Sequence, residues 1–344
     1  MPYVQPSVAD VHVDTALTNI SVAFMQSDQN FVARRVFPEV IVNHKTDAYY
    51  TFDRGEWNRS QMKRRAPGAK APVGTMKLAT DNYNADVFAL AKQVPDEIRA
   101  NADSAIAPDR EASEWLAIQA LLDLEIGWAT TYFTPGAPGG TWTFDVDGVA
   151  SGATAPASFD PTNGSNNDKL QWNDASSTPI EDVRQGKRFV GESTGFRPNV
   201  LTLGRPVFDV LLDHPDIVGR LDRGQTGGPA IVERQNLAAL FELDDVLVMD
   251  GIQNTAKENQ TAAHSYIGGK HALLAYRPPT AGLQTPTAGY TFRWRGIDQS
   301  VPSGAEITRF RQTLEHSDLF EIQTAYDQKL VSKDLGYFFG AIVA

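Results

Sequence analysis

PDREASEWLAIQALLDLEIGWATTYF, residues 108–133, is the longest helical pattern in the chain. Pro108 suits a first helical turn, and Asp109 and Glu111 lie near the positive end of the helix dipole. The pattern predicts a helix over residues 109–133 that spans roughly 40 Å at ~1.5 Å per residue. Its apolar residues recur every three or four positions and so form one stripe, which consists of Trp115, Ile118, Leu122, Ile126, Ala129 and Phe133. We expect this helix to be a long structural element against which other parts of the fold pack, and we call it the spine helix.

Before this helix, residues 46–94 have the pattern of a long β-hairpin. Residues 49–52 have strand chemistry, and residues 76–90 offer returning strands. Between them, residues 55–74 are polar, basic and interrupted by prolines and a glycine. A loop of that size is uncommon in a compact domain and is usually functional or disordered.

Residues 1–45 are predicted to form an arm. Asp14 can cap a short helix in which Leu17, Ile20 and Phe24 fall at helical spacing. A break at Pro38 then precedes a strand at residues 40–42. The apolar residues are too few to close a core by themselves, so the arm must pack on something else.

The chain changes character after the long helix. Residues 134–177 are rich in turn-forming residues, and we interpret them as an insertion that is mostly loop. Thr178-Pro-Ile-Glu181 has the pattern of a capping box with proline at the first helical position, and it predicts a helix that ends at Gly195. Strands and helices then alternate, which predicts an α/β region, and the tail is largely β. The expected elements are strands at 199–203, 245–249, 290–294, 319–326 and 337–343 and helices at 206–213 and 231–241.

Composition excludes several classes of protein. The chain has 344 residues, 42% of them hydrophobic, and no cysteine, which excludes disulfides and thiol nucleophiles. It has no apolar run of ~18 residues and no signal-peptide pattern, so we expect it to stay in the cytoplasm where it is made. The net charge of −11 argues against a protein that coats nucleic acid through a general basic surface.

The charge is distributed unevenly. Residues 46–80 contain seven Lys/Arg and three acids, a net +4, whereas residues 81–130 contain ten acids and three bases, a net −7. Such segments can attract their counterparts on another copy of the chain, or they can be two solvated surfaces that never meet.

No catalytic or metal-binding pattern is complete. Gly191-Glu-Ser-Thr-Gly195 matches G-x-S-x-G, but that motif needs a strand before the serine and a helix after it, and here the order is reversed. The histidines show no metal-ligand spacing, and we interpret His264 and His271 as surface residues. We predict no catalytic, cofactor-binding or metal-binding residues.

Two further patterns allow two readings each. Residues 145–148 and 160–168 are rich in oxygen ligands, but their spacing differs from that of a calcium loop, so turns are expected and opportunistic cation binding is the alternative. Residues 290–295 alternate aromatic and other side chains, with two arginines. A half-buried strand is favoured there over a base-stacking surface.

The order of these segments resembles that of tailed-bacteriophage major capsid proteins, whose shell fold is shared with herpesvirus capsids and encapsulins. Residues 17–24 (LTNISVAF), 31–33 (FVA) and 36–40 (VFPEV) look like the N-terminal arm of that family. The basic hairpin looks like its extended loop, and the long helix like its spine helix. Residues 195–204 (GFRPNVLTLG) resemble the passage into its axial domain, and residues 325–331 (AYDQKLV) resemble its ending.

The resemblance implies an α+β fold with an arm, an extended β-hairpin loop, a peripheral domain with a spine helix and an α/β axial domain. The expected divisions are 1–45 arm, 46–94 extended loop, 95–133 peripheral domain with spine helix, 134–177 insertion, 178–200 peripheral-domain helix, 201–289 axial domain and 290–344 peripheral strands and C-terminus. The loop is expected to contact a neighbouring subunit through Arg54, Trp57, Arg59, Lys63, Arg64, Arg65 and Lys70. The spine is expected to pack through Trp115, Ile118, Leu122 and Ile126.

The function implied is structural, without enzymatic activity or a cofactor. The chain is expected to self-assemble as hexamers and pentamers into an icosahedral shell around phage double-stranded DNA, without sequence-specific DNA binding. Its other expected partners are a scaffolding protein, a portal and, where one exists, a decoration protein, and its place is the virion after assembly in the host cytoplasm. The alternatives are an encapsulin-like shell with protein cargo, an α/β hydrolase using Ser193, and another phage structural subunit such as a tail protein.

Overall fold

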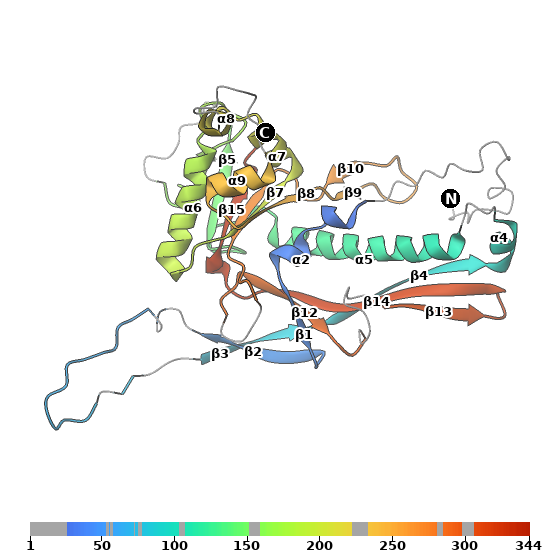
Figure 1. Ribbon diagram of the computed structural model, residues 1–344, viewed down its shortest axis with the longest axis horizontal. Coiled ribbons are helices and arrows are strands. Elements are labelled where there is room, and N and C mark those ends of the chain that lie inside the picture. Colours follow the sequence, from blue (N-terminus) through green and yellow to red (C-terminus); the bar gives the residue numbers. More distant parts are fainter. Residues whose placement is uncertain are drawn as a thin grey trace.

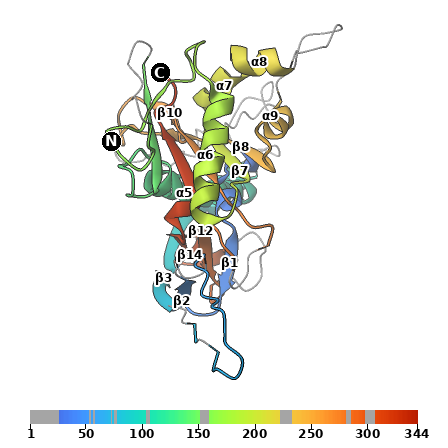
Figure 2. The same cartoon turned by 90° about the vertical axis from the view of Figure 1, so that its left-hand side faces the viewer.

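The computed structural model describes residues 26–52, 55, 58–71, 73–74, 78–102, 107–150, 159–221, 233–280, 285–297 and 306–344. The helix expected at residues 14–24 lies outside these ranges. Figure 1 shows a compact α/β part, an elongated part built along the long helix α5, and a hairpin that projects from the junction of the two. Figure 2, turned by 90°, shows helix α6 lying along the α/β part and the hairpin projecting at the opposite end of the molecule.

The α/β part is built on a six-stranded sheet with the order β6-β5-β15-β11-β7-β8. Its strands are β5 (Phe144–Val149), β6 (Asp168–Leu170), β7 (Val200–Gly204), β8 (Asp245–Met249), β11 (Ala272–Ala275) and β15 (Gly336–Gly340). The central strands are apolar and buried along their whole length, as expected for strands that are covered on both faces. The helices of this part are α6 (Pro179–Thr194), α7 (Arg205–Leu212), α8 (Pro215–Leu221) and α9 (Arg234–Phe241).

In the elongated part, the helix α5 (Pro108–Tyr132) lies on a second sheet. The shared strand of this sheet is β14 (Ser317–Leu330), which pairs with β4 (Asp86–Pro95), β13 (Glu306–Gln312) and β12 (Gly289–Trp294). β1 (Glu39–Val42) adds a parallel strand to β12. The projecting hairpin consists of β2 (Thr46–Phe52) and β3 (Leu78–Asn84). The smaller elements are η1 (Asp28–Asn30), α2 (Ala33–Val36), α4 (Asp96–Asn101), β9 (Ile252–Asn254), β10 (His264–Tyr266) and η2 (Lys333–Leu335).

The described end of the arm packs on the rest of the chain, as predicted. Val32, Val36 and Phe37 are buried in the main core. The side chain of Gln26 exchanges two hydrogen bonds of 2.8 Å with the backbone of Ile252 at the start of β9. These contacts hold residues 26–37 against both parts of the molecule.

The helix α5 lies close to its predicted bounds, and the four residues expected to pack from it are exposed or only partly buried within the subunit. Trp115 is 40% exposed, and Ile118, Leu122 and Ile126 are only partly buried. The buried residues instead follow four-residue steps through Ala112, Leu116, Leu124, Trp128 and Tyr132. Each such step advances about 40° around the helix. The buried line therefore winds from the sheet, at the start of α5, to the main core at its end.

The described residues of 134–177 are mostly turn and loop, as predicted, but the segment also contributes β5 and β6 to the six-stranded sheet. Helix α6 and strand β15 belong to the α/β part and pack on each other, whereas the sequence assigned both to the peripheral domain. These contacts join segments that are far apart in the chain, so local sequence patterns do not predict them.

The bounds of α6 are close to those predicted, but one detail of its start differs. Pro179 occupies the first turn and Gly195, with φ 81°, ends the helix, as expected. Thr178, however, makes no side-chain hydrogen bond to the first turn. The capping-box prediction is therefore wrong, although the helix that it predicted is present.

Candidate subunit interface

The base of the projecting hairpin is fixed to the elongated part by aromatic contacts. The ring of Tyr83 on β3 stacks on Phe292 of β12 with 4.6 Å between centroids, and Tyr49 on β2 lies 5.4 Å from the same ring. The Tyr49 hydroxyl donates a hydrogen bond of 2.9 Å to Asp81 across the hairpin. Tyr290 and Phe292 are buried in this cluster and so form no base-stacking surface. The strand is present, but it is not half-buried as predicted, because Thr291 and Arg293 on its other face are buried as well.

The described tip of the hairpin is basic and exposed. Within the described part of the chain its cationic side chains form no ion pair, and each is exposed to solvent. These side chains are Arg59, Lys63, Arg64, Arg65 and Lys70. The predicted contact residues Arg54 and Trp57 lie outside the described residues. The structure thus places five of the predicted contact residues on one projecting segment.

The acidic segment at residues 81–130 offers fewer unpaired carboxylates than its net charge suggests, because arginines neutralise part of it, among them Arg309 and Arg311 from β13. Arg99 binds Asp109 at 2.7 Å and the buried Asp318 at 2.9 Å. Arg309 also binds Asp318, and hydrogen bonds from the arginines hold the pKa of this carboxyl at about 2. Further ion pairs of the same region are Arg311–Asp96 and Arg110–Glu114. Among its described acids, Glu97 and Glu111 are exposed and form no ion pair.

A buried glutamate joins the arm to the spine helix. Glu125 on α5 is fully buried, and its carboxylate accepts hydrogen bonds from the backbone N–H of Val32 (3.0 Å) and Ala33 (2.7 Å). These amides lie at the start of α2, where backbone N–H groups have no partner within the helix. Burial raises the pKa of Glu125 to about 7. We did not identify this residue from the sequence; its one signal is an acid within the apolar run LLDLEIGW.

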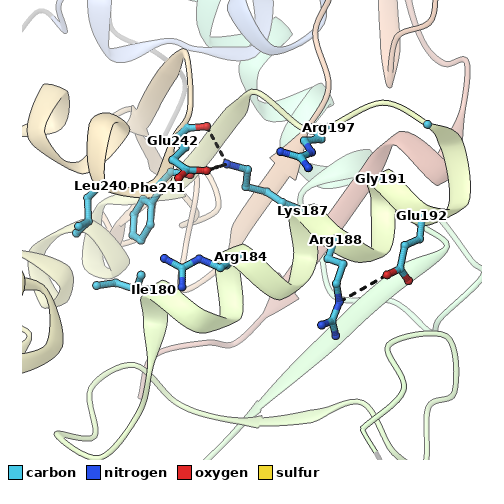
Figure 3. Close-up of a pocket in the computed structure, with 11 residues that line it drawn as sticks. Ile180, Arg184, Lys187, Arg188, Gly191, Glu192, Arg197, Leu240, Phe241 and Glu242 are labelled. Carbon is cyan, nitrogen blue, oxygen red and sulfur yellow. Dashed lines mark hydrogen bonds and ion pairs between the residues drawn. The ribbon is translucent and has the colours of Figure 1, made fainter.

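A second charged surface is a groove of about 610 Å³ between α6 and the end of α9 (Figure 3). Lys187 Nζ donates hydrogen bonds of 2.8 Å to the carbonyl oxygens of Phe241 and Glu242 and so caps α9. The lining residues include no histidine, serine or threonine. Ser193 is not among them, and its hydroxyl donates to the Val190 carbonyl of its own helix at 3.1 Å. The groove therefore brings no serine or histidine together and gives no support to a serine hydrolase that uses Ser193.

Among the described histidines, the two interpreted as surface residues differ in their burial. His264 is exposed, as predicted, but the prediction for His271 is wrong. Its ring is partly buried and packs near Phe133 and Phe338, and Nδ1 accepts a hydrogen bond of 2.9 Å from the backbone N–H of Ala341. Burial lowers the pKa of His271 to about 4. Of the helices in the described ranges, none is long and apolar enough to cross a membrane.

Comparison with known proteins gives one curated relative and several structural neighbours. The major capsid protein of Burkholderia phage BcepMu is 27% identical over 176 residues, which cover 49% of this chain and 52% of that protein. The match therefore spans about half the length of that relative. No protein-family model matches the chain.

The structural likenesses extend over nearly all of the chain. A phage-related protein from Bordetella bronchiseptica RB50 has a TM-score of 0.63 at 18% identity, covering 92% of this chain and 94% of that one. The capsid structure of cyanophage P-SCSP1u has a TM-score of 0.57 at 11% identity, with 99% and 96% covered. The SrpI encapsulin of Synechococcus elongatus PCC 7942 has a TM-score of 0.54 at 10% identity, with 97% of each chain covered.

The fold is the mixed α and β fold shared by phage capsid and encapsulin subunits. The resemblance to the major capsid proteins of tailed bacteriophages, predicted from the sequence, is confirmed by the named relative and by these neighbours. Those named capsid proteins are structural and not enzymes.

Proposed function

We propose that the chain is the capsid subunit of a tailed bacteriophage and assembles through hexamers and pentamers into an icosahedral shell around double-stranded DNA. One observation carries the proposal. The shell-type fold extends over nearly the whole chain, while a basic hairpin projects from it, and the described cations at its tip have no ion-pair partner in their own subunit. A segment of this kind is suited to contact a neighbouring subunit.

The hairpin is proposed to bind an acidic surface of the next copy. Glu97 on α4 and Glu111 at the start of α5 are exposed acids that remain without ion pairs within the described residues. Each exposed ion pair contributes only ~0.2–1 kcal/mol. In a closed shell each subunit is held by several neighbours at once, so weak contacts reinforce one another.

The predicted spine stripe is proposed to serve the same assembly. Trp115 lies on the flank of α5 that faces β4, where Lys92 Nζ is 5.3 Å from the centre of its ring. On β4, Phe88 and Leu90 are 41% and 39% exposed. An apolar surface on this flank is unfavourable in water and is typical of a protein contact. We infer that Trp115, with Ile118, Leu122 and Ile126 beside it, contacts a neighbouring subunit in the shell.

The other partners follow from the same proposal. With the basic hairpin engaged by a neighbouring subunit, the remaining surface of a chain of net charge −11 would enclose DNA without binding it sequence-specifically. A scaffolding protein, a portal and a decoration protein would act on the assembling shell in the host cytoplasm, and the finished subunit would reside in the virion. The alternative is an encapsulin-like shell with protein cargo, and the likeness to the fold of the SrpI encapsulin is the observation that favours it.

Electron microscopy of the purified protein tests the proposal. Closed icosahedral particles support it, whereas tubes or a permanently unassembled subunit contradict it. Particles recovered from the producing cell separate the alternatives, because a phage capsid contains DNA and an encapsulin contains an enzyme.

The hairpin contact has its own test. Reversing Lys63, Arg64 and Arg65 to Glu is expected to abolish assembly, measured by light scattering, and to leave the circular dichroism of the subunit unchanged. Wild-type assembly should weaken as salt rises above ~0.15 M, where the Debye length falls below ~8 Å. The matched control exchanges the same residues with retention of charge, Lys63→Arg, Arg64→Lys and Arg65→Lys, and should assemble normally. Normal assembly of the charge-reversed variant would mean that the hairpin is a solvated surface.

A further inference from the structure

Two oxygen-rich segments that the sequence interprets as turns lie together in the structure. Asp145 and Asp147 are on the same face of β5, because alternate residues of a strand point the same way. Residues 159–167 run along the edge of β5 before β6 begins. The backbone N–H of Asp145 donates to Pro161 at 3.1 Å, and that of Asp147 donates to Asn167 at 3.2 Å.

The side chains between these segments include buried oxygens without donors. Asp145 is 2% exposed; Oδ2 accepts a hydrogen bond of 3.1 Å from the backbone of Gly136, but Oδ1 has no hydrogen-bond partner. Asn167 is fully buried, and its Nδ2 donates to the Asp145 carbonyl at 3.0 Å and to Asp147 Oδ2 at 3.3 Å. The Oδ1 of the same amide also has no partner. Buried acceptors of this kind are rare in native proteins and call for an unseen water or ion.

The charges at this position are also unbalanced. Lys169, the cation nearest along the chain, binds Asp182 at 2.9 Å and Gln185 at 2.7 Å on α6. This cation is therefore not paired with the carboxylates of Asp145 and Asp147.

We propose that Asp145, Asp147 and Asn167 bind a hard divalent cation, Ca²⁺ in the first place, between β5 and residues 159–167. Carboxylate and amide oxygens are the ligands that Ca²⁺ prefers, and water completes its coordination sphere. Two carboxylates match the charge of a divalent ion. Asp147 is partly exposed, which gives the ion a path from solvent. The described ranges hold no metal-binding group of three or more His, Asp or Glu; here the third ligand is an amide.

The bound ion would fasten three segments at one edge of the six-stranded sheet. β5 contributes the two carboxylates, residues 159–167 contribute Asn167, and Gly136 in the turn after α5 is already tied to Asp145. The proposal concerns the isolated subunit and does not depend on shell assembly.

Terbium luminescence and thermal unfolding of the full chain, freed of metal with a chelator, test the site. Tb³⁺ replaces Ca²⁺ and is excited through a nearby indole; Trp142 is buried at the start of the same segment. We expect sensitised Tb³⁺ emission, which excess Ca²⁺ abolishes by displacing the Tb³⁺. We also expect a rise in Tm of about 2–5 °C when the Ca²⁺ concentration is ~100 times its Kd. Absence of both effects would overturn the proposal.

Variants locate the effect. Asp145→Asn keeps the shape of the side chain and is expected to lose at least tenfold in Ca²⁺ affinity. This loss is expected whether the Tm of the metal-free variant is higher or lower than that of the wild type. Asp147→Asn, at the partly exposed end, should weaken binding as well. Glu125→Gln is the matched control, since it neutralises a buried carboxylate whose oxygens already have donors, and it should retain the full Ca²⁺ response. Retention of that response by Asp145→Asn would contradict the assignment of the site.

Discussion

Replacing Glu125 by glutamine should lower the stability of the folded chain at acid pH and raise it at alkaline pH. Burial raises the pKa of this carboxyl from 4.5 to about 7 in the folded chain. The folded state therefore binds the proton more tightly than the unfolded state. The stability contributed by this group is fully present below pH 4.5 and is lost as the pH rises to about 7.

The size of the effect follows from the same values. A shift of this magnitude corresponds to about 3 kcal/mol at ~1.4 kcal/mol per pH unit. Glutamine removes the ionisation but presents an amide NH₂ group to one of the Val32 contacts, which costs ~0.5–1.5 kcal/mol. We therefore expect E125Q to be less stable than the wild type by about 1 kcal/mol at low pH and more stable by about 2 kcal/mol above neutrality.

Urea unfolding followed by circular dichroism, repeated across this pH range on the unassembled subunit, measures both differences. Hydrogen exchange of the Val32 and Ala33 amides reports whether the contact itself persists. Glu111→Gln is the control, because Glu111 lies on the same helix but is exposed, and it should change stability by only a few tenths of a kcal/mol. An E125Q variant that is equally destabilised at both pH values would refute the reasoning and mean that the buried carboxylate is ionised throughout.

Three further outcomes are expected. Trp128→Ala should destabilise the subunit by about 3–5 kcal/mol in urea unfolding, whereas Trp115→Ala should cost less than ~1 kcal/mol there but reduce shell yield; equal losses would contradict the two faces assigned to α5. Ser193→Ala should leave folding and assembly intact, and esterase activity abolished by that change would overturn the structural role. Trypsin should cut first within residues 59–71, identified by mass spectrometry of the fragments, because its sites there are exposed; first cuts within α5 would mean that this helix is misplaced.

Local patterns were sufficient for α5, α6, α7 and α9 and for the hairpin, whereas the short helices α2, α4 and α8 were not predicted. Pro108 and Pro179 begin α5 and α6, and Gly195 ends the latter, all through effects that act within one turn. The strand-forming residues 49–52 likewise predicted β2, and the alternation of aromatic residues at 290–294 predicted β12.

Features that depend on distant pairing were not predictable. Trp142, Phe144 and Val146 alternate like a strand, but the place of β5 in the sheet depends on its pairing with β15, nearly two hundred residues later in the chain. The same limit applies to the interface. Counting charges from residue 81 to 130 could not include Arg309 and Arg311, which come from β13 and neutralise part of that segment. The spacing of Asp145 and Asn167 along the chain also conceals their contact, which the sheet edge creates.

The position of β15 has a consequence for synthesis. This strand lies between β5 and β11 in the six-stranded sheet, yet it follows every other strand of that sheet in chain order. Until the ribosome has released residues 336–340, β5 and β11 each have an edge without hydrogen-bond partners, and the sheet remains in two pieces. A nascent chain therefore cannot present a finished α/β part to its neighbours. Incomplete copies would be kept out of a growing shell by the order of translation itself.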